Sequence, residues 1–357
     1  MKRFFLPLLL LLAPFMVGGC DTTETTPKSA KELSIVFVPK LTGNAFFESA
    51  NKGVQAYAAK HGFTVAYKGS PRAAIPDQIA IIKDAIAERV DALCISSLDA
   101  TALDEVLKEA MKAGIKVVTW DSDVSGDARM IMVSQGTPDQ LGAMLVEMGA
   151  KSLADRGIDP GRDAVTYAWH YSQATVTDQN SWQAAGERYI RANYPKWINV
   201  APQNYYSEQD AEKAVAVGKT ILAEHPEIDL IICNDSTSLP GQAQALQELG
   251  LSAKDVTVTG FASPNPMREY RKTGIIERWG LWDCQVQGAL GCYLAYYLAS
   301  GKQLKVGDRV DVPEIGTVEV MPNTVLDPKA YTSSTSGVIL LPNRSEFTIS
   351  NVDDYDF

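Results

Sequence analysis

Residues 33–61 read LSIVFVPKLTGNAFFESANKGVQAYAAKH, and this stretch decides the fold. It opens with a short apolar run rich in β-branched residues, 33–39, which is typical of a buried strand. A segment of helical period follows over 45–61. The sequence therefore predicts a strand and then a helix, joined by a short polar turn.

The same alternation continues along the chain and is laid out twice. The further strands are predicted at 63–67, 92–96, 116–120, 130–133, 164–168, 199–204, 230–233, 256–261 and 276–281. The further helices are predicted at 76–88, 102–113, 179–192, 208–224, 239–249, 266–272 and 285–299. Such a pattern predicts parallel sheets with right-handed crossovers. We therefore expect an α/β protein with two doubly wound, Rossmann-like domains joined by a hinge.

The length of 357 residues also suits two domains. The tail after residue 301 has short apolar runs and several prolines, which is too little for a third core. We expect it to return to both domains. The predicted first lobe is 32–136 with about 284–325, and the predicted second lobe is 137–283 with about 326–357.

The N-terminus reads as a secretory signal over residues 1–19. Two positive charges precede an apolar run that is too short to span a membrane, which takes about 20 residues. The small residues before Cys20 resemble a bacterial lipobox, in which the cysteine is lipidated. An ordinary signal with a chance cysteine is the alternative. With lipidation, residues 20–31 become a polar tether, and the protein is anchored in the periplasm or at the cell surface.

Charge and cysteine spacing exclude several classes of function. The net charge of −10 argues against nucleic acid as a partner. The four cysteines beyond Cys20 form no CxxC or Cys/His cluster, so they predict buried thiols rather than a metal or redox site. We expect no cofactor.

Candidate site residues follow the predicted strands of both halves. In open α/β sheets, ligands bind beyond the carboxyl ends of the strands. The candidates are Lys40, Asn44, Phe46, Phe47, Asp121, Asp123, Trp169, Asp178, Gln179, Asn234, Ser236, Ser263 and Trp282. Carboxylates, amides and an ammonium suit ligand hydroxyls, and aromatic rings suit C–H faces. We therefore expect a small polyhydroxylated ligand, enclosed when the hinge closes.

Some of these residues have plain structural alternatives. Asp121 and Asp123 could belong to a solvated turn, and Asp178 could cap a helix. Phe46 and Phe47 are adjacent, so we expect one in the core and one in the cleft.

Several motifs carry a family resemblance that runs from about residue 33 to 357. They include PKLTGNAFF (39–47), TWDSD (119–123), TVTDQN (175–180), GFASPNPMREY (260–270) and GLWD (280–283). The chain resembles the autoinducer-2-binding proteins of Lsr-type uptake, within the pentose- and ribose-type periplasmic binding proteins of ABC importers. Rhamnose-binding proteins are close relatives of that group.

The resemblance implies that Lys40, Asp121, Asp178 and Gln179 contact the ligand. Two further contacts lie in a segment that reads Pro-Asp-Ala in the family and 234-NDS-236 here. Both flanking positions thus differ from the family pattern. Because an unpaired buried polar group costs about 1–3 kcal/mol, we expect these two side chains to find partners, such as a further ligand hydroxyl.

The expected function is that of a monomeric solute-binding lipoprotein serving the permease of an ABC importer. Its ligand would be autoinducer-2, or a pentose or deoxyhexose such as ribose or rhamnose. One alternative is a sensory module that presents the ligand to a membrane receptor. Another is a secreted glycoside hydrolase using two of Asp121, Asp123 and Asp178. We disfavour an enzyme because no nucleophile motif or metal set is present in the sequence.

Overall fold

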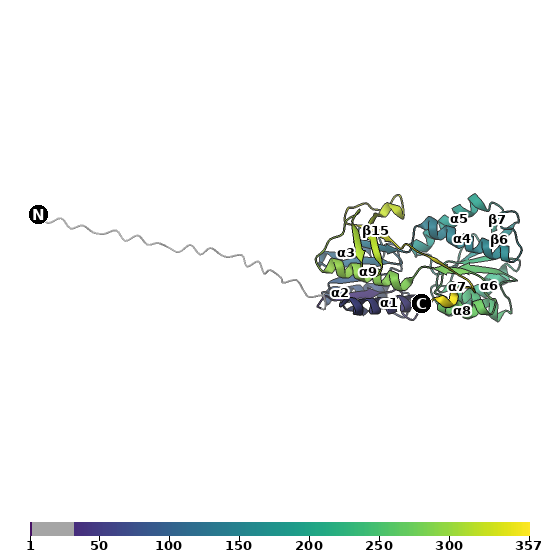
Figure 1. The fold of residues 1–357 in the computed structure, drawn as a ribbon, viewed down its shortest axis with the longest axis horizontal. Coiled ribbons are helices and arrows are strands. Elements are labelled where there is room, and N and C mark those ends of the chain that lie inside the picture. Colours follow the sequence, from purple (N-terminus) through teal and green to yellow (C-terminus); the bar gives the residue numbers. More distant parts are fainter. Residues whose placement is uncertain (2–31) are drawn as a thin grey trace.

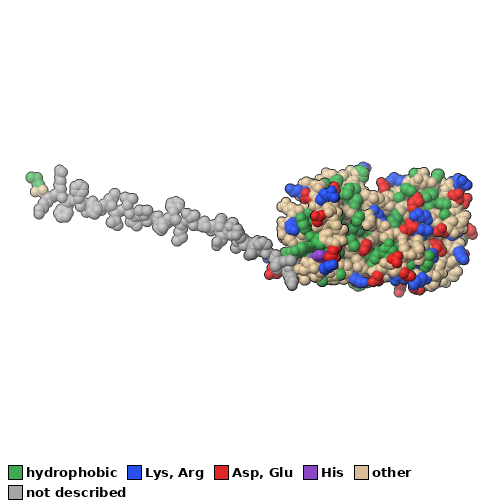
Figure 2. Space-filling model, in the orientation of Figure 1, with side chains coloured by type: hydrophobic (Ala, Val, Ile, Leu, Met, Phe, Trp, Pro, Cys, Tyr) green, Lys and Arg blue, Asp and Glu red, His purple; other side chains and the backbone are tan. Residues whose placement is uncertain are grey.

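A computed structural model describes Met1 and residues 32–357 of the chain. The predicted signal, the tether and Cys20 lie outside the described residues. Two α/β lobes lie side by side (Figure 1), each built around its own parallel sheet, as the alternating pattern predicts. On the visible face, acidic and basic side chains are intermixed over both lobes (Figure 2).

The first lobe contains a seven-stranded sheet in the order β14-β15-β5-β4-β3-β1-β2, parallel except for β14. Its strands are β1 (Ile35–Val38), β2 (Val65–Tyr67), β3 (Ala92–Ile95), β4 (Lys116–Trp120), β5 (Ile131–Ser134), β14 (Met321–Pro322) and β15 (Gly337–Leu340). Its helices are α1 (Ala45–His61), α2 (Ile75–Ala87), α3 (Asp104–Lys112) and α9 (Cys284–Ala299). Successive strand residues face opposite sides, so Phe37 joins the core beneath α1 and α9, and Val36 joins the core beneath α2 and α3.

The second lobe contains a five-stranded sheet in the order β10-β9-β6-β7, with β8 also paired to β6. Its strands are β6 (Val165–Tyr171), β7 (Trp197–Asn199), β8 (Tyr205–Tyr206), β9 (Leu230–Cys233) and β10 (Thr257–Gly260). Its helices are α4 (Pro138–Asp155), α5 (Thr177–Asn193), α6 (Ala211–Glu224), α7 (Ser238–Glu248) and α8 (Pro264–Lys272). Helix α4 packs on α5, and α6 packs on α7. Figure 1 shows these pairs on opposite sides of the sheet.

The chain passes between the lobes three times. The first crossing joins β5 to α4, and the second joins β11 (Trp279–Leu281) to α9. The third joins β15 to β16 (Ser345–Phe347), which pairs antiparallel with β11. A hairpin of β12 (Arg309–Val312) and β13 (Gly316–Glu319) and two short 3₁₀ turns, η1 (Asn323–Val325) and η2 (Val352–Asp354), complete the tail.

The predicted return to the second lobe at about residue 326 is wrong. Strand β15 pairs in parallel with β5 and buries Val338 and Ile339, so the chain stays in the first lobe to Leu340. Two local predictions also differ from the structure. Helix α4 was not predicted, although Thr137 and Gln140 form a capping box at its start. Of the predicted strand 199–204, only Asn199 lies in a strand, as the last residue of β7, and residues 200–204 form a loop before β8.

Candidate functional site

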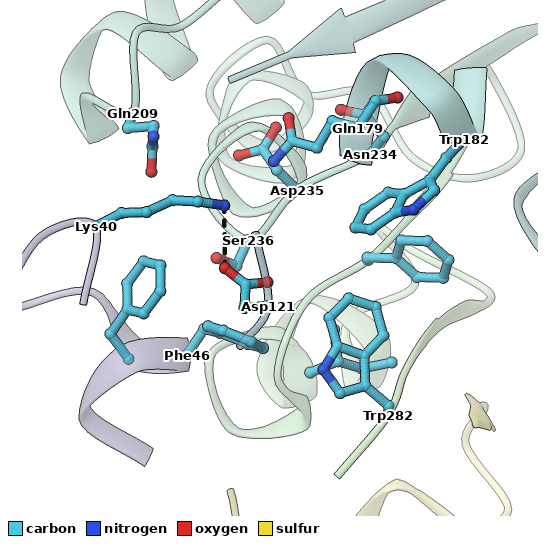
Figure 3. A pocket seen from close by; sticks show the side chains of 13 residues that line it. Lys40, Phe46, Asp121, Gln179, Trp182, Gln209, Asn234, Asp235, Ser236 and Trp282 are labelled. Carbon is cyan, nitrogen blue, oxygen red and sulfur yellow. Dashed lines mark hydrogen bonds and ion pairs between the residues drawn. The ribbon is translucent and has the colours of Figure 1, made fainter. Parts of the chain in front are cut away.

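A cavity lies between the two lobes, at the carboxyl ends of their strands (Figure 3). Its lining residues are Lys40, Phe46, Phe47, Asp121, Gln179, Trp182, Gln209, Asn234, Asp235, Ser236, Phe261, Leu281 and Trp282. Charged and amide groups thus share the cavity with aromatic rings, as recognition of a polyhydroxylated molecule requires.

The topology brings these side chains together. Lys40 follows β1 and Asp121 follows β4, while Asn234 follows β9 in the other lobe. Gln179 lies in the first turn of α5. Because parallel strands end at the same edge of a sheet, residues distant in sequence converge on one site.

The charged centre of the cavity is an ion pair between Lys40 and Asp121. Lys40 Nζ lies 3.0 Å from Asp121 Oδ2, and both side chains are buried. Ser96 Oγ donates to the same carboxylate oxygen at 2.7 Å. Burial acts to lower the pKa of Lys40, but Asp121 and the charges of Asp178 and Asp235 outweigh it and raise that pKa. Lys40 is therefore a firmly charged donor.

The backbone at Asp121 is left-handed, with φ of 59°. For a residue other than glycine, this backbone conformation costs about 1–3 kcal/mol, and it persists only where surrounding contacts hold it. The Asp121 backbone carbonyl accepts a hydrogen bond from Gln135 Nε2 at 3.1 Å. Gln209, another lining residue, is also left-handed, with φ of 56°.

Two further carboxylates belong to the second lobe. Asp235 accepts hydrogen bonds from the backbone N–H groups of Thr237 and Ser238, at 2.8 and 3.0 Å. Burial raises the pKa of Asp235 even though these bonds oppose the shift. Burial likewise raises the pKa of Asp178 to about 6, against the opposing charge of Lys40.

Asn234 presents an unused acceptor. The residue is 0% exposed and lines the cavity. Its Nδ2 donates to the Gln179 carbonyl at 3.4 Å, whereas its Oδ1 has no hydrogen-bond partner among the described residues. A buried acceptor of this kind has room for one donor, from water or from a bound molecule.

Ser236 finds its partner within the protein. Its Oγ donates to Asn44 Oδ1 at 3.3 Å, and Asn44 Nδ2 donates to Thr237 Oγ1 at 3.3 Å. Asn44 precedes α1 in the first lobe and also caps it, accepting from the backbone N–H of Phe46. The hydrogen bonds among Asn44, Ser236 and Thr237, here called the clasp, therefore join the lobes beside the cavity.

The structure brings most of the predicted site residues together. Those that line the cavity are Lys40, Phe46, Phe47, Asp121, Gln179, Asn234, Ser236 and Trp282. The predicted division between Phe46 and Phe47 is wrong, because both rings line the cavity and both pack against Trp120. Asn44 lies beside the cavity in the clasp. Asp178 lies next to it and accepts from Ser122 Oγ across the lobes at 2.7 Å.

Three predicted residues lie elsewhere. Asp123 forms a bidentate pair with the buried Arg129, which fixes the end of β4. Trp169 is fully buried inside the second lobe, where its indole N–H donates to Glu187 at 2.8 Å. Ser263 is buried at the start of α8 and is not part of the lining.

Sequence reasoning missed some lining residues, namely Trp182, Gln209, Asp235, Phe261 and Leu281. Asp235 lies between two predicted positions, and Phe261 and Leu281 stand at strand ends, so the same rule could have included them. Trp182 lies within α5 and Gln209 in a loop, and no pattern in the sequence marks either residue.

The chain is similar to known binding proteins. One solved structure, LsrB from Clostridium saccharobutylicum in complex with AI-2, shares 60% identity and has a TM-score of 0.90. That match covers 91% of this chain and 100% of the other. A solute-binding protein from Clostridium phytofermentas with bound L-rhamnose has a TM-score of 0.79 at 23% identity, over 91% of this chain and 98% of the other, and so shows a shared fold.

A curated relative is the D-ribose/D-allose-binding protein of Pseudomonas aeruginosa. It is 27% identical over 307 residues, which cover 82% of this chain and 91% of the relative. These relatives are named as binding proteins, not as enzymes. Between Glu32 and Phe357, no helix combines the length and apolar character needed to cross a bilayer. The model of the periplasmic binding protein domain matches residues 35–303, and the chain belongs to that family.

Proposed function

We propose that this chain is the extracytoplasmic binding protein of an ABC importer and that it captures AI-2 (autoinducer-2) between its lobes. The observation that carries the choice of ligand is the 60% identity to LsrB, a protein solved in complex with AI-2, over 91% of this chain. Ribose and rhamnose are the next candidates, because more distant relatives bind such sugars.

The chemistry of the cavity supports a small, neutral, hydroxyl-rich ligand. Asp121 and Asp235 accept hydrogen bonds from hydroxyls, and Lys40 donates to ligand oxygens. Because one lining cation faces two lining carboxylates, an anionic ligand is disfavoured. Trp182 and Trp282 supply flat apolar surfaces for the C–H faces of a ring.

Asn234 adds a specific requirement. Its unpartnered Oδ1 accepts one hydrogen bond, so the preferred ligand places a hydroxyl there. Ser236 already donates to Asn44, so it contributes to closure as well as to the lining. The two departures from the family pattern thus have different roles.

Isothermal titration with AI-2, D-ribose and L-rhamnose tests the proposal. We expect AI-2 to release or absorb heat with micromolar or tighter affinity and Asp121→Ala to abolish that binding. Asp123→Asn is a matched control, because its carboxylate lies outside the cavity and pairs with Arg129. Folded protein that binds none of the three ligands would overturn the assignment.

We further propose that Cys20 carries the lipid that holds the protein at the membrane. The support is the sequence around it, two glycines before the cysteine and a polar segment after it. Cys20→Ser should move the protein from the membrane fraction to the soluble extracytoplasmic fraction. If wild type and variant fractionate alike, the anchor is refuted and an ordinary signal is indicated.

A further inference from the structure

Gln135 connects the two lobes although it is not part of the cavity lining. It directly follows β5, at the first crossing, and its side chain is buried. Its Nε2 donates to the Asp121 carbonyl at 3.1 Å and to Asp178 Oδ2 at 3.2 Å. One amide thus touches a cavity residue of the first lobe and a carboxylate of the second.

Gln135 is also linked by hydrogen bonds to the other two crossings. Its Oε1 accepts from Gln287 Nε2 at 3.0 Å, and Gln287 Oε1 accepts from the indole N–H of Trp282 at 2.6 Å. Trp282 stands at the second crossing and lines the cavity. The Gln135 carbonyl accepts from Arg344 Nη1, on the third crossing, at 2.8 Å. All three crossings are therefore linked through one side chain and its backbone.

Asp178 depends on donors from the opposite lobe. Its carboxylate accepts from Ser122 and Gln135, both of the first lobe. The charged groups that act on it are Lys40, which favours its ionised form, and Asp121, which opposes it. When a buried carboxylate loses its hydrogen-bond donors, its ionised form is strongly disfavoured. These bonds join residues of two lobes, so they form only when the lobes are together.

We propose that Gln135 is a positioning residue that couples hinge closure to the ligand cavity. Its amide holds the left-handed backbone of Asp121 within the first lobe, and the same amide also bonds the Asp178 carboxylate when the two lobes are in contact, as they are in this structure. Closure therefore assembles the two acidic sides of the site in one step. The ligand-binding part of this inference rests on the proposed function.

The test compares Gln135→Met with Gln242→Leu. Gln242 is a matched buried glutamine of the second lobe, bonded to His170 Nδ1 and the Gly218 carbonyl and not part of the cavity lining. We expect Gln135→Met to weaken AI-2 binding about ten- to hundredfold, since it removes a bond to a charged group. Gln242→Leu should leave affinity within about threefold while lowering stability.

The pH profile separates positioning from plain destabilisation. Loss of a donor disfavours ionised Asp178, so the pH dependence of AI-2 affinity in Gln135→Met should shift to higher pH. Gln242→Leu should keep the wild-type profile. Equal affinities and equal profiles for the two variants would overturn the proposal.

A ligand-free measurement keeps this test apart from the choice of ligand. If the wild type binds no AI-2, the proposed function fails, and amide hydrogen exchange decides the coupling. Gln135→Met should speed exchange at residues 121–123 and 177–181, in both lobes, and Gln242→Leu at neither. Unchanged exchange at both segments refutes the coupling. If Gln135→Met does not fold, Gln135→Glu keeps the shape and replaces the donor with an acceptor.

Discussion

Replacing Asn234 with leucine should have opposite effects on ligand binding and on the ligand-free protein. Leucine has the same branched arrangement of side-chain heavy atoms but no polar atoms. In the ligand-free protein, the substitution removes a buried acceptor that has no hydrogen-bond partner among the described residues. Such an acceptor lowers the free energy of unfolding by about 1–3 kcal/mol. The substitution also removes the long 3.4 Å bond to the Gln179 carbonyl, which is worth about 0.5–1 kcal/mol at most. We therefore expect the free energy of unfolding to rise by about 1 kcal/mol.

With ligand present, the sign reverses. A ligand hydroxyl that donates to Asn234 Oδ1 would face an apolar side chain in the variant and lose its partner, at about 1–3 kcal/mol. This corresponds to a Kd that is about 5- to 150-fold weaker. Urea unfolding and isothermal titration with AI-2 measure the two effects on the same preparations. A variant that is less stable and binds as tightly as wild type would refute this reasoning.

Other predictions concern closure and pH. Thr237→Val removes one bond of the clasp without touching the cavity lining, so AI-2 dissociation in stopped-flow fluorescence should quicken about two- to tenfold. Thr220→Val, whose hydroxyl bonds only within its own helix, should not change that rate. Because the pKa of Asp178 is raised to about 6 in the closed form, acidification from pH 7 to 5 should favour ligand-free closure, seen as a smaller radius of gyration in X-ray scattering. Asp178→Asn should remove that pH response, and an unchanged response would contradict the assignment. Burial lowers the pKa of His170 to about 4 against an ordinary 6.5, so wild-type stability should fall by about 3 kcal/mol as pH drops through this window. His170→Asn keeps a donor for its glutamine partner and should lack that part of the loss in acid unfolding.

The strand-end rule predicts much of the cavity lining from the sequence alone. Asp121 directly follows β4 and Lys40 lies two residues after β1, so the rule that ligands bind beyond carboxyl ends finds both residues. The same rule also selected Trp169 and Asp123, which are not part of the cavity lining. It states where a chain segment ends but not which way a side chain turns, and both residues turn toward partners in their own lobe.

The sequence by itself determined the α/β alternation, the two lobes and the polar character of the cleft. These depend on local periodicity and on the order of elements, which are properties of the chain. Only the tertiary structure decided that β15 stays in the first sheet, that Ser236 pairs with Asn44, and that Gln135 bridges the Asp121 backbone carbonyl and the Asp178 carboxylate. Each of these results from contacts between segments far apart in the chain. Such contacts are fixed by register and by the approach of the two lobes, and no local pattern encodes either.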